Sequence, residues 1–147
     1  MPKILVIEDQ EAPWDNFLLC LTQICKVARV DIDRARYYTE AEKMIGGTTQ
    51  YDLIFLDHRM PHDDPGCTDI NNFERFCQQL DNIGYGLLPL LAEAQPKAFI
   101  VGTSSLHIGD IGRYAVPELC LNKVNMFDEL PPLMEALTIA QRVDRRP

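Results

Sequence analysis

Asp57 stands at the end of the stretch of this sequence best placed to do chemistry. It follows Leu53–Leu56, a short continuous apolar run that is typical of a strand buried on both faces of a parallel sheet. Met60 and Pro61 then turn the chain away. In open α/β sheets, ligands bind beyond the carboxyl ends of the strands, so Asp57 lies where such a fold binds them. Taken alone, an acidic residue at one strand end is most simply a solvated side chain.

Three other predicted strands end in polar groups that suit the same chemistry. Glu8 and Asp9 follow the first strand, Thr103 follows the fourth, and Lys123 comes shortly after the fifth. Three carboxylates in one crevice repel one another unless a cation neutralises them, and hard oxygen ligands without a His or Cys cluster indicate Mg²⁺. Lys123 is a compact cation suited to phosphate, and Thr103 adds a hydrogen-bond donor. This set predicts that Asp57 attacks phosphorus and forms an aspartyl phosphate.

Five strands alternate with helices along the chain. Apolar runs or alternating patterns predict the strands over residues 3–7, 28–33, 53–56, 98–102 and 119–121. Such alternation implies parallel strands with right-handed crossovers and helices on both faces. We therefore expect an α/β fold with a doubly wound, five-stranded parallel sheet. No linker or internal repeat divides residues 1–147, so we expect a single domain.

The connecting segments carry helical patterns with recognisable ends. Thr39 and Glu42 form a capping box that predicts the start of the second helix, and Gly46-Gly47 predict its end. Further helices are expected from residue 68 or 69 to 80 and, as an extra short helix before the fourth strand, over 87–94. The segment 106–116 is a poor helix because two glycines weaken it. The last helix is expected to start at Pro131-Pro132.

These residues together resemble those of a response-regulator receiver domain of the CheY-like family. The resemblance covers essentially the whole chain and rests on Lys-Ile-Leu-Val-Ile-Glu8-Asp9, Asp-Leu-Ile-Phe-Leu-Asp57-x-x-Met-Pro61, Thr103-Ser104 and Lys123. It implies the flavodoxin-like strand order 2-1-3-4-5. Each motif is weak alone, but five matches in the right order, each at or just after a strand end, are specific.

The resemblance also implies a role for each site residue. Asp57 accepts the phosphoryl group, Asp9 binds Mg²⁺ directly, Glu8 assists through water, the backbone carbonyl of Arg59 is the third protein ligand, and Thr103 and Lys123 hold the phosphoryl oxygens. A histidine kinase or a phosphotransfer protein would donate the group, and a downstream protein would respond to it. Such a domain is not an enzyme beyond self-phosphorylation from small donors and self-dephosphorylation.

Several positions depart from the family pattern. Cys120 replaces an aromatic residue that turns inward on activation, and Val124 replaces the proline that commonly follows the lysine. The chain between Asp57 and Thr103 is also longer, and we expect an insertion at 82–96 to supply the partner surface. The expectation is a stand-alone receiver with an atypical output face. The alternative is a receiver-shaped docking or scaffold module that acts without phosphorylation. A hydrolase is disfavoured because Asp57-His58-Arg59 lacks a second aspartate.

The three histidines have simpler interpretations than catalysis. His58 and His62 flank Asp57 and would touch a phosphoryl group if they faced it, but an exposed loop histidine is usually only solvated. We expect His107 to be structural. The Arg59 side chain either covers the phosphoryl group or points to water.

Composition limits the partners. The 147 residues carry a net charge of -8, which argues against direct nucleic-acid binding because that requires basic residues. There is no signal-peptide pattern and no apolar run long enough to cross a membrane, so we expect no membrane partner. The five cysteines form no Cys-x-x-Cys pair, which favours free thiols and a cytoplasmic protein.

Overall fold

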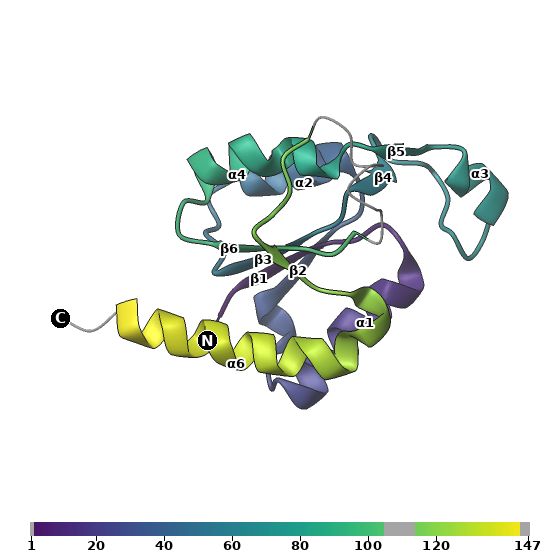
Figure 1. The fold of residues 1–147 in the computed structure, drawn as a ribbon. Coiled ribbons are helices and arrows are strands. Elements are labelled where there is room, and N and C mark those ends of the chain that lie inside the picture. Colours follow the sequence, from purple (N-terminus) through teal and green to yellow (C-terminus); the bar gives the residue numbers. More distant parts are fainter. Residues whose placement is uncertain (1, 105–113, 145–147) are drawn as a thin grey trace.

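A five-stranded parallel sheet lies at the centre of the structure, a computed structural model that describes residues 2–104 and 114–144 (Figure 1). Its strands are β1 (Ile4–Ile7), β2 (Ile32–Ala35), β3 (Leu53–Leu56), β6 (Phe99–Gly102) and β7 (Leu119–Cys120). They lie in the order β2-β1-β3-β6-β7, and every neighbouring pair is parallel. Counted along the chain this is the order 2-1-3-4-5, so the predicted fold class is confirmed.

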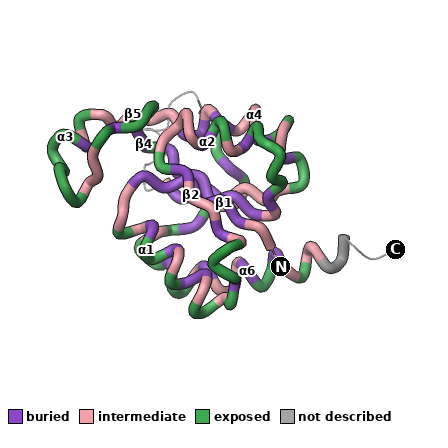
Figure 2. The backbone as a smooth tube through the Cα atoms, turned by 180° about the vertical axis from the view of Figure 1, so that it is seen from behind, coloured by how far each residue is buried: buried purple, intermediate pink, exposed green. Residues whose placement is uncertain are grey.

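Helices cover both faces of the sheet (Figure 1). One face carries α1 (Glu11–Leu19), which continues as a π-helical turn (Cys20–Ile24), and α6 (Met126–Asp144), while the other carries α2 (Tyr38–Ile45) and α4 (Leu88–Ala94). Successive strand residues face opposite sides. Ile4 and Val6 therefore join the core beneath α1 and α6, and Leu5 and Ile7 join the core beneath α2 and α4. Burial on both faces explains why β1 and β3 are continuous apolar runs (Figure 2).

A hairpin-like excursion, which we call the arm, occupies residues 59–82 between β3 and α4. Its base is a two-stranded antiparallel sheet of β4 (Arg59–Pro61) and β5 (Leu80–Asn82), and it carries α3 (Phe73–Cys77) at its far end. The arm extends away from the central sheet and is largely exposed (Figures 1 and 2). A 3-10 turn, Gly84–Leu87, leads from the arm into α4.

Two helices thus precede the fourth strand of the sheet, so the extra helix is present, and the structure separates their roles. α4 packs beside α2 and buries Leu91 in the core, as a crossover helix does. α3 belongs to the arm. The chain between Asp57 and Thr103 therefore contains the arm, residues 59–82, in addition to α4, and the expected insertion at 82–96 stays a prediction.

The predicted helix from residue 68 or 69 to 80 is wrong in extent. Only residues 73–77 are helical, and Leu80 begins β5. Ile70 and Phe73, expected on the buried face, are 72% and 65% exposed, whereas Phe76 is buried. The helical spacing of these residues led to a wrong prediction, because the central five-stranded sheet does not extend beneath the arm and cannot bury that face.

Several other element ends differ from expectation. α2 begins at Tyr38 without a side-chain cap, and Glu40 instead accepts a hydrogen bond from the Arg36 N–H at 2.8 Å. Gly46 ends α2 as predicted. Residues 29–31 form a 3-10 turn before β2, and β7 ends at Cys120, one residue early. α6 begins at Met126, so the two prolines lie inside it. Most of the 106–116 segment lies outside the described residues.

None of the helices in the described ranges is long and apolar enough to span a bilayer. All five cysteine thiols are free.

Candidate functional site

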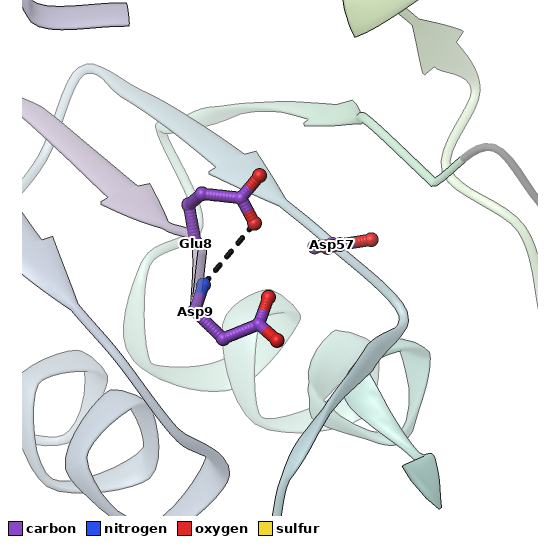
Figure 3. Close-up of side chains that lie close together, drawn as sticks. All are labelled: Glu8, Asp9 and Asp57. Atoms are coloured by element: carbon purple, nitrogen blue, oxygen red, sulfur yellow. Dashed lines mark hydrogen bonds between the residues drawn. The ribbon is translucent and has the colours of Figure 1, made fainter. Parts of the chain in front are cut away.

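The carboxyl ends of β1 and β3 bring three acidic side chains together. Glu8 and Asp9 directly follow β1, and Asp57 directly follows the neighbouring β3. One carboxylate oxygen from each lies within 4.8 Å of the others, and all three residues are buried. Figure 3 shows the three side chains converging from two adjacent strands.

Lys123 completes this cluster from the other end of the sequence. Its Nζ lies 2.8 Å from Glu8 Oε1 and 3.1 Å from Asp57 Oδ2. The short 3-10 turn Lys123–Asn125 holds the residue in place, because the Asn122 side chain accepts a hydrogen bond from the Val124 N–H. One ammonium group thus bridges two of the three carboxylates, and two net negative charges remain when all three carboxylates are ionised.

Asp9 is the carboxylate that this arrangement leaves unsatisfied. Both of its side-chain oxygens are buried and have no hydrogen-bond partner among the described residues. Burying an ionised carboxylate without a partner is costly, so the site favours a cation beside Asp9. Oxygen-only ligands fit Mg²⁺, which takes few protein ligands and keeps several waters. The residues present therefore fit the metal that the sequence predicts.

Burial and mutual repulsion perturb the ionisation of the cluster. Burial, and then the charge of Asp57, raise the pKa of Asp9 to about 6. The same two causes raise the pKa of Glu8 well above its ordinary value. Burial lowers the pKa of Lys123, but the charges of Asp57 and Glu8 outweigh it and raise that pKa above its ordinary value. The lysine is therefore charged at neutral pH. At Asp9, a bound proton and a bound cation would compete for the same carboxylate.

An open pocket beside the cluster gathers the other predicted site residues. Asp57, Arg59, Thr103 and Lys123 all line it. Thr103 follows β6 and is buried, and its N–H donates to the Leu56 carbonyl at 3.0 Å. Arg59 is exposed at the base of the arm. A small molecule entering this pocket would meet the Asp57 carboxylate, the Thr103 side chain and the lysine together.

Of the two histidines that flank Asp57, His62 is exposed as expected and His58 is not. His58 is fully buried, so the prediction that it lies in an exposed loop is wrong. Its ring stacks on the Tyr85 ring, and the two ring centroids lie 4.5 Å apart. His62 is exposed, stacks on Tyr38 and pairs with Asp63 at 3.0 Å. His107 lies outside the described residues.

Sequence reasoning missed two groups of residues that shape this site. Asp69 of the arm accepts a hydrogen bond from the Glu11 N–H at 3.1 Å and so caps α1, whose own N-cap residue, Gln10, makes no side-chain bond. Ile83 to Tyr85 pack directly behind Asp57 and His58. The only signal for the second group was the glycine pair flanking Tyr85, which indicates close backbone approach as readily as a turn.

Cys120 and Val124, the departures noted in the sequence, are both exposed. The Cys120 thiol lies 3.7 Å from the Pro117 carbonyl. The expectation that the output face is atypical stays a prediction.

Solved structures similar to this chain include response-regulator receiver domains. A CheY-like receiver domain from Methylobacillus flagellatus is 21% identical, with a TM-score of 0.64 over 93% of this chain and 98% of that one. The N-terminal domain of a response regulator/sensory box/GGDEF 3-domain protein from Carboxydothermus hydrogenoformans is 12% identical, with a TM-score of 0.66 over 97% and 98%.

A third structure, a response regulator from Burkholderia pseudomallei with a phosphorylated aspartic acid, calcium ion and citrate, is 19% identical, with a TM-score of 0.52 over 99% of this chain and 76% of that one. No family model matches the sequence, and no curated protein matches it. The chain therefore has the CheY-like receiver fold, and the resemblance that the sequence predicted is confirmed at the level of the fold.

The raised pKa of Asp9 predicts a stability that depends on pH and on Mg²⁺. A folded-state pKa of about 6 exceeds the value of an unfolded chain, so its contribution to stability is present at low pH and is lost as pH rises through 6. Asp9→Asn removes this loss, so above about pH 7 the metal-free variant should be more stable than the metal-free wild type, by about 2 kcal/mol. Thermal unfolding at several pH values measures the difference.

Mg²⁺ supplies the control for that prediction. Millimolar Mg²⁺ should raise the unfolding temperature of the wild type more at about pH 7.5 than at about pH 5, because protons compete for Asp9. The Asp9→Asn variant should respond weakly at both. An equal response of the two proteins at high pH would show that the cation binds elsewhere.

Proposed function

We propose that this protein is a phosphoryl-accepting receiver of a two-component system, in which Asp57 takes up a phosphoryl group and thereby switches a protein partner. The observation that carries the proposal is the contact of Lys123 with both Glu8 and Asp57, beside the unpartnered carboxylate of Asp9. A purely structural cluster would leave no carboxylate unsatisfied. Here the candidate nucleophile Asp57 and the cation of Lys123 line an open pocket, and the unpartnered carboxylate of Asp9 lies beside Asp57.

Each residue has a distinct part in the transfer. Asp57 Oδ2 attacks phosphorus, and the leaving group departs on the opposite side. Lys123 stabilises the negative charge that spreads over the phosphoryl oxygens, because its ammonium already lies 3.1 Å from the attacking oxygen. Thr103, at the wall of the same pocket, donates a hydrogen bond to one of those oxygens. The protein does no further chemistry than accepting the group and slowly losing it.

Asp9 and Asp57 would hold Mg²⁺ directly, Glu8 would act through water, and the Arg59 carbonyl would be the third protein ligand. The His58 carbonyl accepts the N–H groups of Ile83 and Gly84. Because carbonyls alternate in direction along an extended strand, the Arg59 carbonyl would turn away from that segment. When bound, Mg²⁺ neutralises charge on the phosphoryl oxygens and lets a phosphodonor approach the acidic site.

The donor would be a histidine kinase or a phosphotransfer protein, and the responding partner is another protein. The fold and the net charge of -8 favour a protein partner over direct nucleic-acid binding. We place this function in the cytoplasm, with residues 1–147 acting as one domain.

Incubation with acetyl phosphate in Mg²⁺, followed by intact mass spectrometry, tests the proposal. We expect a gain of one phosphoryl group that disappears when EDTA replaces Mg²⁺. A folded wild-type protein that gains no phosphate from acetyl phosphate or from a histidine kinase would contradict it.

The second candidate is a docking module that works without phosphate, and the arm favours it. Ile70 and Phe73 are large apolar side chains that the arm leaves 72% and 65% exposed. An unchanged mass in the experiment above, together with a partner lost on Ile70→Ser and Phe73→Ser substitution, would favour this function instead.

A further inference from the structure

His58 joins the candidate acceptor to a segment of chain some 25 residues away. Its backbone carbonyl accepts the N–H groups of Ile83 at 2.9 Å and Gly84 at 2.7 Å. Its ring Nδ1 accepts the N–H of Tyr85 at 2.9 Å, and the Tyr85 ring stacks on the imidazole. One fully buried residue thus satisfies three consecutive backbone donors. Because Nδ1 accepts, the neutral ring carries its proton on Nε2.

The same residue also holds the acceptor carboxylate. The His58 N–H donates to Asp57 Oδ1 at 2.8 Å, while Lys123 approaches Oδ2 at 3.1 Å. The two oxygens of Asp57 are therefore fixed from two sides, and Oδ2 is the one left beside the lysine. Any rotation of the His58 peptide would turn Oδ1 and swing Oδ2 away from Lys123.

Gly84 shows how closely the segment supports this peptide. A Cβ built on Gly84 would lie 1.9 Å from the Asp57 carbonyl oxygen, so the two backbones are in direct contact. The imidazole bond to Tyr85 fixes where this contact forms, since it anchors the residue that follows Gly84. The ring itself packs against Tyr85 and Tyr114, within the core that α2 and α4 cover.

We propose that His58 is a positioning residue for phosphoryl transfer to Asp57, acting through the hydrogen bond that its Nδ1 accepts from the Tyr85 backbone. This inference rests on the proposed function. In the transfer from acetyl phosphate, Asp57 Oδ2 forms a bond to phosphorus, and the phosphorus–oxygen bond to the acetyl group breaks, with acetate leaving with the electron pair. No proton passes through His58, so its contribution is geometric.

Two substitutions of His58 with similar side-chain shapes test whether its hydrogen-bond acceptor atom, Nδ1, is needed. His58→Asn places an amide oxygen close to the position of Nδ1, whereas His58→Leu has nearly the same outline and no acceptor. Leu91→Ala, in the same core but away from Asp57, is the control for lost stability alone. The measurement is the maximal labelling rate from acetyl phosphate in saturating Mg²⁺, per folded molecule, with folding followed by thermal unfolding.

His58→Leu should label about tenfold to a hundredfold more slowly than wild type, since a small misplacement of a reacting group costs this much. His58→Asn should recover to within about threefold of wild type, and Leu91→Ala should keep the wild-type rate, because neither removes the acceptor that positions the peptide. This pattern supports positioning, because a role in stability alone would leave the rate per folded molecule of His58→Leu unchanged, as it does for Leu91→Ala.

Four results would overturn the inference. His58→Leu labelling at the wild-type rate, or His58→Asn slowed as much as His58→Leu, would show that the acceptor atom does not matter. If His58→Leu does not fold, the comparison of His58→Asn with wild type decides, and a tenfold loss in a folded His58→Asn protein would refute positioning. A wild type that takes no phosphate refutes the proposed function and this inference with it, whereas a labelled wild type with unaffected variants refutes only the inference.

Discussion

Asp57→Asn is expected to abolish phosphoryl uptake from acetyl phosphate while the protein stays folded. The amide keeps the shape of the carboxylate but lacks the anionic oxygen that must attack phosphorus. Asp57 is buried beside Glu8 and Asp9, so removing its charge also relieves repulsion in the cluster. The variant should therefore unfold at a temperature equal to or above that of the metal-free wild type. Intact mass spectrometry and thermal unfolding measure the two effects.

Substitutions of the two supporting residues should give smaller and graded losses. Lys123→Ala removes a charged group that contacts Asp57 Oδ2 at 3.1 Å, and we expect the labelling rate to fall by about tenfold to a hundredfold. Thr103→Ala removes one neutral donor, so the loss should be about two- to tenfold. If phosphate uptake survives in Asp57→Asn, another residue is the acceptor. If Thr103→Ala loses more than Lys123→Ala, the roles of the two residues are assigned wrongly.

Gly84→Ala is expected to have the largest effect of any single added methyl group in the described chain. The new Cβ would lie 1.9 Å from the Asp57 carbonyl oxygen and 2.7 Å from the Met60 side chain, and the backbone atom cannot move without displacing the end of β3. We expect a loss of about 3 kcal/mol in the free energy of unfolding, together with slower labelling, because the displaced peptide carries the acceptor. Chemical denaturation and the labelling rate are the measurements.

Gly47→Ala is the matched control for that substitution. A Cβ there would meet only the Met44 and Lys43 carbonyl oxygens, at 3.4 and 3.5 Å, which is ordinary contact on an exposed surface. Its effect should stay within about 0.5 kcal/mol. Equal effects of the two substitutions would mean that the contact between Gly84 and Asp57 does not constrain the strand end.

The central sheet and the acidic cluster were predictable because both depend on local pattern and simple topology. β1 and β3 are buried on both faces, so each reads as an unbroken apolar run that ends on a carboxylate. Parallel strands end at one edge, which brings Glu8, Asp9 and Asp57 together without any knowledge of side-chain packing. Lys123 follows the same rule at the last strand.

The arm and the burial of His58 were not predictable, because both depend on contacts between distant segments. The spacing of Ile70, Phe73 and Leu80 fits one helix with a buried face. In the structure the arm lies away from the central sheet, so this face stays largely exposed and Leu80 belongs to a strand. His58 follows a charged residue and precedes another, as loop residues do. Its partners are Ile83 to Tyr85, and nothing near it in the sequence indicates them.

The central claim is that Asp57 itself carries the phosphoryl group, and trapping by reduction tests it most directly. Borohydride reduces an acyl phosphate to an alcohol and leaves free carboxylates untouched. After treatment of the wild type with acetyl phosphate and Mg²⁺, followed by borohydride and peptide sequencing by mass spectrometry, position 57 should be read as homoserine. Homoserine at another aspartate, or at none in a folded protein exposed to Mg²⁺ and donor, would contradict the account.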